Sequence, residues 1–467
     1  MTKDLTVGSP MGLILNFGLP TLLGMLFQQF YNLMDTMIVG KLLGAQALAA
    51  VGSTSSINFF VIGFCMGVCS GFAIPVAQRM GAGDYARMRR HVANAAYLSI
   101  LFATVLTVAT GLLCRTILTV MNTPGDIFAD AERYIFIIFM GIPTTFLYNL
   151  LAGILRSLGD SRTPVYFLAL SSVLNIALDF AFILWFDAGV AGAAIATVVS
   201  QGISGAACLV FMAKKYPVLR MSREERRLNW SSCRTLCIIG VPMGMQYSIT
   251  AIGSIVLQSA VNGLGSTYVA AVAAGSKLFQ LLGCPFDAMG ATMATYCGQN
   301  VGAWKLDRLG QGIRACALLG VLYSALAFGG MLLFSEPCAM LFLNPGEPEV
   351  ERLVALTSQY IVISSAFFIP LSLVNIVRFS IQGMGYSGFA ILAGVLEMAA
   401  RTGVAFFLVP VLGYTAACFA SPAAWVCADL FLIPASLICI GRLRRKMPVQ
   451  AAAREPAPQN TLETART

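Results

Sequence analysis

Long, nearly uncharged apolar runs recur along the whole chain, and they restrict its fold more than any other feature. Two of these runs are Leu98 to Leu113 and Ile313 to Phe334. About 20 apolar residues span the hydrocarbon core of a bilayer as a helix, which satisfies its backbone polar groups internally. Only 11% of the 467 residues are charged, against about 25% in soluble domains. We therefore predict an all-α polytopic membrane protein and exclude soluble, disordered and disulfide-stapled secreted chains.

Breaks at Gly, Pro and charged residues divide these runs into twelve predicted spans, in two sets of six. The longest polar segment, 214–234, separates the sets and is expected to be a cytoplasmic linker between an N-terminal lobe (1–213) and a C-terminal lobe (235–446). Residues 447–467 are expected to form a disordered cytoplasmic tail. The predicted spans cover about residues 12–38, 47–79, 92–119, 132–155, 164–186, 189–213, 235–261, 268–299, 311–335, 352–381, 388–410 and 413–441.

The basic residues between the spans predict the orientation of the chain. Loops on one side of the membrane hold 21 Lys and Arg residues, and loops on the other side hold 4. Because Lys and Arg are enriched in cytoplasmic loops, we expect both termini to be cytoplasmic, in a multi-pass protein of the cell (inner) membrane. The same loops explain the net charge of +9, so no nucleic acid partner is expected. The polar N-terminus lacks the features of a signal peptide.

Short motifs repeat between the two halves at a nearly constant offset. Residues 78–82 (QRMGA) recur as 299–303 (QNVGA), and 158–161 (LGDS) is echoed by 384–387 (MGYS). With six spans in each half, both halves enter the membrane from the same side, so the pseudo-two-fold axis lies along the membrane normal. Repeats of this kind usually frame a central site reached by alternating access. The alternative is chance similarity among Gly- and Ala-rich helices.

Eight ionisable residues lie within the predicted spans, where charge is costly and marks candidate functional sites. The N-terminal half holds two acids and no base, whereas the C-terminal half holds three of each. Glu397 and Arg401 are spaced i,i+4 and can form a structural ion pair. The other charged residues of the C-terminal half have two possible roles, either pairing across helices or, for the basic ones, contact with an anionic substrate. The eight residues are Asp35, Asp179, Lys277, Asp287, Arg378, Glu397, Arg401 and Asp429.

The two unpaired acids lie on polar faces of their helices. Three predicted spans carry such a face, formed by Gln28, Asn32 and Asp35, by Ser171, Asn175 and Asp179, and by Thr197, Gln201 and Ser204. If these faces converge, they form an oxygen-rich site with two carboxylates, which suits a monovalent cation or a shared proton. The alternative is that each face only joins helices through hydrogen bonds.

Several ordered motifs resemble those of the multidrug and toxic compound extrusion (MATE) family of efflux transporters. The resemblance covers about residues 10–445 and implies two six-helix lobes around a central cleft. It also implies export of amphipathic, often cationic compounds in exchange for H⁺ or Na⁺, by a protein that is not an enzyme. The motifs are Asn32 to Asp35 with Gly40 to Gly44, Gln78 to Gly83, Leu155 to Asp160, Asn175 to Asp179, and Gly192 to Ala194 with Thr197.

The resemblance further implies a coupling site. In one branch of the family the coupling cation binds the N-terminal lobe, and Asp35, Asn175, Asp179 and Thr197 match that site residue by residue. Gln28, Asn32, Ser171 and Gln201 would form its supporting polar face. A second branch uses a Glu in the seventh span and an Asp in the tenth, and this chain has neither. Beyond H⁺ or Na⁺ no metal or cofactor is expected, and the partners expected are the lipid bilayer and small amphipathic substrates, with the protein a monomer.

Two other functions were weighed. A flippase of the same superfamily, moving a lipid-linked anionic precursor, would be favoured by a cleft rich in Lys and Arg. An intramembrane metalloenzyme needs clustered histidines or His with carboxylates, and the one histidine, His91, lies in a basic loop. The thirteen cysteines show no metal-ligand spacing and are expected to be small buried hydrophobes.

Overall fold

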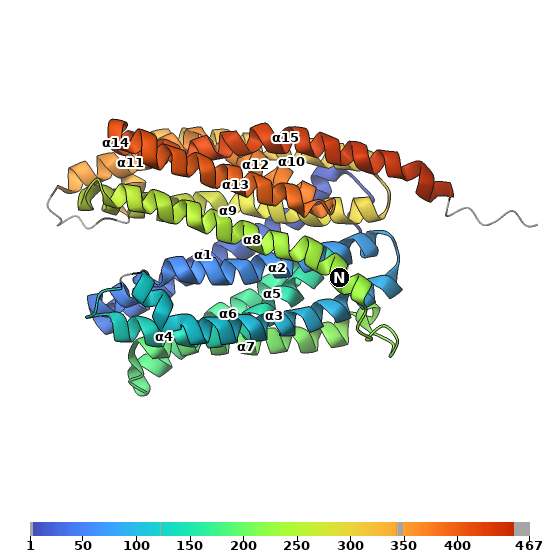
Figure 1. Cartoon of the computed structure of the whole chain (residues 1–467), viewed down its shortest axis with the longest axis horizontal. Helices are drawn as coiled ribbons and strands as arrows, with labels where there is room; N and C mark the ends of the chain where they lie inside the picture. The colour runs from blue at the N-terminus through green and yellow to red at the C-terminus, as the bar shows by residue number, and fades with distance from the viewer. Residues whose placement is uncertain (1–2, 122, 342, 344–348, 453–467) are drawn as a thin grey trace, which may run out of the picture.

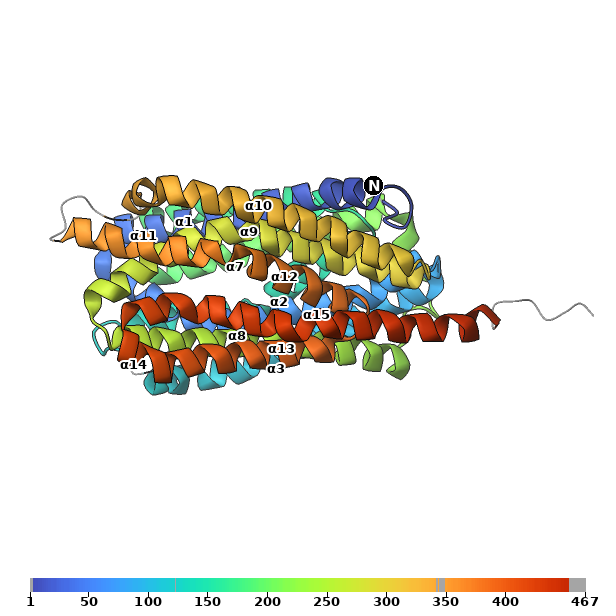
Figure 2. The same ribbon diagram turned by 90° about the horizontal axis from the view of Figure 1, so that it is seen from above.

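The computed structural model describes residues 3–121, 123–341, 343 and 349–452, and every regular element within them is helical. Helices α1–α7 form an N-terminal bundle and α8–α15 a C-terminal bundle, which lie one above the other in Figure 1; in Figure 2, seen from above, the C-terminal bundle lies in front of the N-terminal one. The elements are α1 (Pro10–Ser53), α2 (Ser55–Gly81), α3 (Tyr85–Val120), α4 (Phe128–Met140), α5 (Ile142–Ser157), α6 (Arg162–Phe180), η1 (Ala181–Trp185), α7 (Gly189–Lys215), η2 (Pro217–Leu219), α8 (Trp230–Asn262), α9 (Ser266–Gly302), α10 (Asp307–Met340), α11 (Val350–Ala366), α12 (Phe368–Gly383), α13 (Ser387–Gly403), η3 (Val404–Leu408), α14 (Val409–Leu412) and α15 (Tyr414–Ala452).

The number of membrane crossings agrees with the prediction of about twelve. Ten helices of the described residues are long and apolar enough to cross a bilayer. Two further pairs pass the same test together, α4 with α5, bent by 45°, and α11 with α12, bent by 51°. Each second helix has a proline within its first three residues, Pro143 and Pro370, where the missing N–H and the fixed φ interrupt the helical ladder. The chain is a multi-pass integral membrane protein.

The predicted boundaries differ from the structure mainly around the first two spans. Residues 47–53 continue α1 beyond a break at Gly44, whose φ of 86° is left-handed, and α2 starts only at Ser55. The helices also take residues from both ends of the segment 214–234, because α7 ends at Lys215 and α8 starts at Trp230. Asn229 begins α8 by accepting a hydrogen bond from the backbone N–H of Ser232 (2.9 Å), as N-cap residues do. Helix α15 continues through residues 447–452 of the predicted tail, and 453–467 lie outside the described residues.

The end of the molecule that carries the linker, residues 216–229, is called the linker end below and lies to the right in Figure 1. Each bundle has its own hydrophobic core, but the start of α1 belongs to the core of the C-terminal bundle. Ile14 and Phe17 are buried there with Phe286 and Tyr296, whereas Ile38 further along α1 packs in the N-terminal core. Helix α1 therefore joins the two bundles.

Helices α2 and α8 form the closest contact between the bundles. Both carry a Gly-x-x-x-Gly motif, Gly67 with Gly71 on α2 and Gly240 with Gly244 on α8. A Cβ atom at Gly67 would lie 2.6 Å from the backbone oxygen of Met243 and 2.7 Å from the Cα of Gly244, so any side chain there would push the helices apart. Small residues at this spacing let membrane helices pack backbone to backbone.

Candidate functional site

Asp35 of α1 and Asp179 of α6 meet inside the N-terminal bundle. Their carboxyl groups lie close enough to interact electrostatically, and Asp179 is fully buried. In the described part of the chain, the Oδ1 atoms of both residues accept no hydrogen bond from a protein donor. Two carboxyl groups in contact cannot both stay ionised without a compensating charge, so the pair needs a bound proton or cation.

Asn175 and Thr197 lie beside this pair. The side-chain amide of Asn175 is 3.3 Å from the hydroxyl of Thr197. When the amide is turned so that both of its ends are satisfied, it donates to Oδ2 of Asp179 (3.0 Å) and its oxygen is 3.1 Å from the backbone nitrogen of Thr197. Helices α1, α6 and α7 therefore bring all four residues to one place. Their role as ligands of a coupling ion stays a prediction.

Two tyrosines complete the surroundings of the carboxyl pair and were not predicted. The hydroxyl of Tyr31 is 3.3 Å from that of Thr197, and Tyr134 of α4 interacts electrostatically with Asp35, Tyr31 and Asp179. The sequence did carry a signal for Tyr31, which precedes Asp35 by four residues and so shares its helical face. Tyr134 follows the charged residues Glu132 and Arg133 near the start of α4, and only the packing of α4 against α1 and α7 brings it to the site.

The side chains of the predicted supporting face differ in burial and in hydrogen-bond partners. Within the described residues, none of the four side chains assigned to it forms a hydrogen bond with Asp35 or Asp179. Gln201 instead accepts a hydrogen bond from the hydroxyl of Thr145 on α5 (3.1 Å), which joins α7 to α5. Ser171 is buried, Gln28 is half-buried and Asn32 is exposed. Among the described residues of the three polar faces, Asn175 is therefore the one whose side chain hydrogen-bonds to the pair, and Thr197 lies next to it.

The charges of the C-terminal bundle form a network around Arg378 of α12. Arg378 makes a close ion pair with Glu397 of α13, and Arg401 is 3.8 Å from the other carboxylate oxygen of Glu397. The i,i+4 pair therefore exists, but Glu397 has its closer partner on another helix. Asp287 and Asp429 interact electrostatically with Arg378. Lys277 is exposed and takes no part in this network.

The two bundles are held together at the linker end by hydrogen bonds from the repeated motifs. On α9, the side chain of Gln299 donates to the backbone oxygen of Ser157 (2.9 Å) and accepts from the backbone N–H of Leu5 (2.9 Å). On α2, the side chain of Gln78 donates to the backbone oxygen of Gly383 (3.0 Å). Equivalent residues of the repeat thus contact the end of the equivalent helix in the opposite bundle. We call these contacts the linker-end seal.

The N-terminal segment, residues 3–8, lies across this seal. Its backbone N–H at Lys3 donates to the oxygen of Leu158 (3.3 Å) in the N-terminal bundle. In the C-terminal bundle, Lys305 binds the backbone oxygen of Thr6 (2.9 Å) and Arg308 binds that of Gly8 (2.8 Å). The segment therefore bridges the loops that follow α5 and α9.

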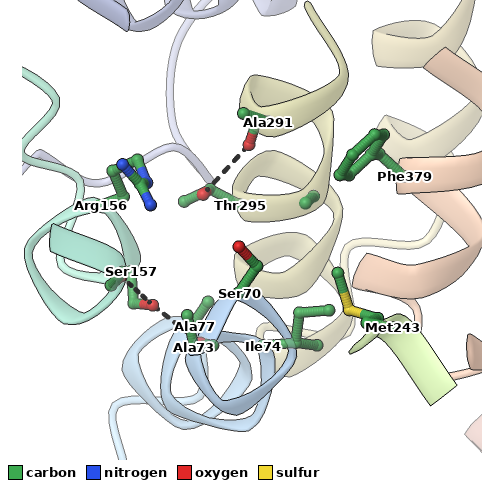
Figure 3. Close-up of a pocket in the computed structure, with 12 residues that line it drawn as sticks. Ser70, Ala73, Ile74, Ala77, Arg156, Ser157, Met243, Ala291, Thr295 and Phe379 are labelled. Carbon is green, nitrogen blue, oxygen red and sulfur yellow. Dashed lines mark hydrogen bonds between the residues drawn. The ribbon is translucent and has the colours of Figure 1, made fainter. Parts of the chain in front are cut away.

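A cavity of about 50 Å³ lies between the bundles, next to the seal. Its polar lining comes from Ser70, Arg156, Ser157 and Thr295, and Met243 and Phe379 are among its apolar residues. Figure 3 shows the Arg156 side chain beside Thr295. The predicted span 132–155 left Arg156 in the loop that follows it. That interpretation is corrected, because α5 continues to Ser157 and directs Arg156 between the bundles.

Two carboxylates at the linker end are held by hydrogen bonds outside the membrane. Glu225 accepts a bidentate interaction from Arg89 (2.7 and 2.8 Å) and a bond from the backbone N–H of Ser222 (2.8 Å), and these bonds lower the pKa of Glu225 to about 2. Burial opposes ionisation of Asp160, but hydrogen bonds from Thr163 and Tyr216 outweigh it and lower the pKa of Asp160. These contacts fix the linker and the start of α6.

The side chains able to bind a metal ion are those of His, Cys, Asp and Glu, and most of the cysteines are buried. The described residues contain no group of three or more His, Cys, Asp or Glu side chains placed to hold a metal ion. All thirteen cysteines are free thiols and ten of them are buried, in line with the interpretation as small hydrophobes.

Comparison with known proteins identifies the family. The MatE family model matches residues 20–181 and 242–407. The probable multidrug resistance proteins YpnP and YoeA of Bacillus subtilis (strain 168) are 31% and 30% identical, over 66% and 71% of this chain and 68% and 73% of their own lengths. A solved outward-facing multidrug resistance MATE transporter of the MOP superfamily has the same fold, with a TM-score of 0.87, 21% identity, and coverage of 95% of this chain and 100% of that structure. The chain therefore belongs to the MatE family of multidrug efflux transporters.

Proposed function

We propose that this protein is a secondary active multidrug exporter of the cell membrane, which exchanges H⁺ or Na⁺ for amphipathic compounds by alternating access of its two bundles. The linker end would face the cytoplasm, where the excess of Lys and Arg places it. The observation that carries the proposal is the close approach of the carboxyl groups of Asp35 and Asp179, whose electrostatic partners among the described residues include no Lys or Arg.

The coupling would work through the charge of this pair. Asp35 belongs to α1, the helix whose first turns pack in the C-terminal core and whose later turns pack in the N-terminal core. Binding a proton or Na⁺ removes repulsion between α1 and α6 and changes the preferred position of α1. An ion shifts a conformational equilibrium only by its difference in affinity for the two states, and a carboxyl pair that closes or separates supplies such a difference.

The linker-end seal supports the second part of the proposal. Hydrogen bonds from Gln78 and Gln299 close the two bundles at one end, and the bonds join bundle to bundle rather than helices within one bundle. A substrate from the cytoplasm would enter when this seal opens and leave when it is closed, as here. The pseudo-symmetry of the two glutamines fits the rocking of two related lobes.

Transport by purified protein in vesicles tests the coupling. We expect efflux of a fluorescent amphipathic cation to be driven by a pH gradient alone or by a Na⁺ gradient alone, and the active gradient identifies the ion. Asp35→Asn and Asp179→Asn keep the size of the side chains but remove the charge, so each should abolish gradient-driven efflux. Wild-type rates in both variants would refute the proposal.

Asp187→Asn provides the matched control. Asp187 is an exposed loop residue of the same bundle with a φ of 48°, a conformation that asparagine tolerates as well as aspartate. This variant loses the same charge outside the site and should transport at the wild-type rate. Its failure together with the other two would indicate a general effect of removing charge.

A further inference from the structure

Arg156 is a cation placed between the two bundles without an anion to pair with. In the part of the chain that the structure describes it forms no ion pair, and its electrostatic partners are Tyr148, Tyr247 and the thiol of Cys69. Intramembrane arginines normally pair with an acid or face a water-filled space. Arg156 has no acid partner among the described residues, and its side chain lines the cavity of about 50 Å³ between the bundles.

The position of this cavity makes Arg156 a candidate for substrate contact. Residues of α2 and α5 form one wall, and residues of α8, α9 and α12 form the other. Ser157, next to Arg156, accepts the hydrogen bond of Gln299 that closes the linker-end seal. A compound entering from that end would therefore pass Arg156 as the bundles separate. The planar guanidinium presents a fork of donors that matches a carboxylate or phosphate group.

An acid lies further along the same space. Asp287 of α9 precedes Ala291 by four residues and Thr295 by eight, and both of these line the cavity, so all three share one helical face. Asp287 is exposed although its neighbours Phe286 and Ala288 are buried. Eight residues of helix place Asp287 about 12 Å beyond Thr295.

Tyr247 of α8 connects the two charged positions. It interacts electrostatically with Asp287, Arg378 and Arg156, so both charges border one region between the bundles. Arg378 is occupied by Glu397, whereas Arg156 has no such partner among the described residues. The region therefore holds the unpaired cation Arg156 near the linker end and the carboxylate of Asp287 further from that end.

We propose that Arg156 and Asp287 are the two charged ends of a substrate site, and that the preferred substrates are amphiphiles that carry a carboxylate or phosphate as well as a positive charge. The anionic group binds Arg156, the cationic group binds Asp287, and the apolar body lies against Met243 and Phe379. This inference rests on the proposed export function and specifies its substrate class.

A structural role for Arg156 is the competing explanation. It lies in the last turn of α5, where a cation interacts favourably with the helix dipole. That role depends only on charge at the helix end and would be indifferent to the chemistry of a ligand. A comparison of two ligands that differ in one carboxylate therefore separates the explanations.

Rhodamine B and rhodamine B ethyl ester are such a pair, because they share the cationic ring system and differ in a free or esterified carboxylate. We propose to measure binding of both dyes to purified protein in detergent by fluorescence anisotropy, without any ion gradient. The wild type should bind rhodamine B about tenfold or more tightly than the ester, as a charge-assisted hydrogen bond implies. Arg156→Gln should bring the ratio of the two affinities close to one, and Arg156→Lys should restore part of it.

The controls separate this inference from folding and from coupling. Arg162→Gln removes an exposed cation at the start of α6 and should keep the wild-type ratio, whereas Asp287→Asn should weaken both dyes. A wild type without preference for rhodamine B, including one that binds neither dye, would overturn the inference. So would an Arg156→Gln variant with an unchanged ratio. Because no gradient is used, a failure of ion coupling at Asp35 and Asp179 leaves the outcome of this experiment unaffected.

Discussion

The linker-end seal predicts how far a single side chain can shift the two bundles. Gln299 is 1% exposed and makes two hydrogen bonds between segments, to Ser157 and to Leu5, both 2.9 Å long. Gln299→Leu keeps much of the volume but removes both bonds. It leaves one backbone oxygen and one backbone N–H without a partner in a buried place.

The magnitude follows from the cost of those two groups. A buried polar group without a partner costs about 1–3 kcal/mol, so the variant should destabilise the closed seal by about 3 kcal/mol. This penalty applies only to the closed state, because opening exposes both groups to water. At about 1.4 kcal/mol for each factor of ten, the ratio of open to closed protein should rise by about 100-fold.

Gln78→Leu is a comparison within the same molecule. Gln78 occupies the equivalent position of the repeat but makes one hydrogen bond, to Gly383 (3.0 Å), from a half-buried position. Its removal should cost about 1 kcal/mol, which corresponds to about a fivefold change. The two variants should therefore rank in the order of their hydrogen bonds and burial.

Double electron–electron resonance would measure the populations of open and closed protein. The spin labels would be placed at Ala86 and Gln311, one exposed residue on each bundle at the linker end. The exposed Cys427 would first be replaced by Ser. We expect a longer-distance population that increases from wild type to Gln78→Leu and further to Gln299→Leu. Identical distance distributions in all three proteins, or a larger effect of Gln78→Leu, would refute the reasoning.

Two further predictions concern charges at other places. The pKa of Glu225, about 2, lies below the usual value near 4.3. Its contact with Arg89 is therefore fully present above about pH 5 and is lost as the pH falls from about 4 to 2. Pepsin should cleave residues 216–229 faster across that range, whereas Glu225→Gln should be cleaved readily at pH 4 already and lose this pH dependence. Arg378→Met should lower the free energy of unfolding by about 3–5 kcal/mol, because it leaves the buried Glu397 with the more distant Arg401. Thermal unfolding in detergent would measure this loss. A midpoint equal to that of Lys277→Met, a control at an exposed position, would contradict it.

Helical spacing predicted three polar faces, and the family resemblance then selected four of their residues as the candidate site. Asp35, Asn175, Asp179 and Thr197 were placed on polar faces because a periodicity of 3.6 residues assigns a face without knowledge of any neighbour. Whether such faces meet is a different question. Gln201 lies on a polar face too, but its partner is Thr145, since the rotation of α7 directs that side chain toward α5.

The sequence by itself determined the environment of this protein and its all-helical fold. Hydropathy and the distribution of Lys and Arg are properties of each segment, and the cost of exposing backbone polar groups to lipid leaves helices as the outcome for such segments. The repeats could likewise be read from the residues, although their contacts could not.

The tertiary structure decided which residues face one another. It joined Glu397 to Arg378 more closely than to Arg401, brought Tyr134 to the carboxyl pair, and directed Arg156 into a cavity between the bundles. It also gave the repeated glutamines their partners, with Gln299 bonded to Ser157 across 142 residues of sequence. These contacts depend on how helices that are distant in the chain pack and rotate against each other. A local sequence pattern does not specify this packing.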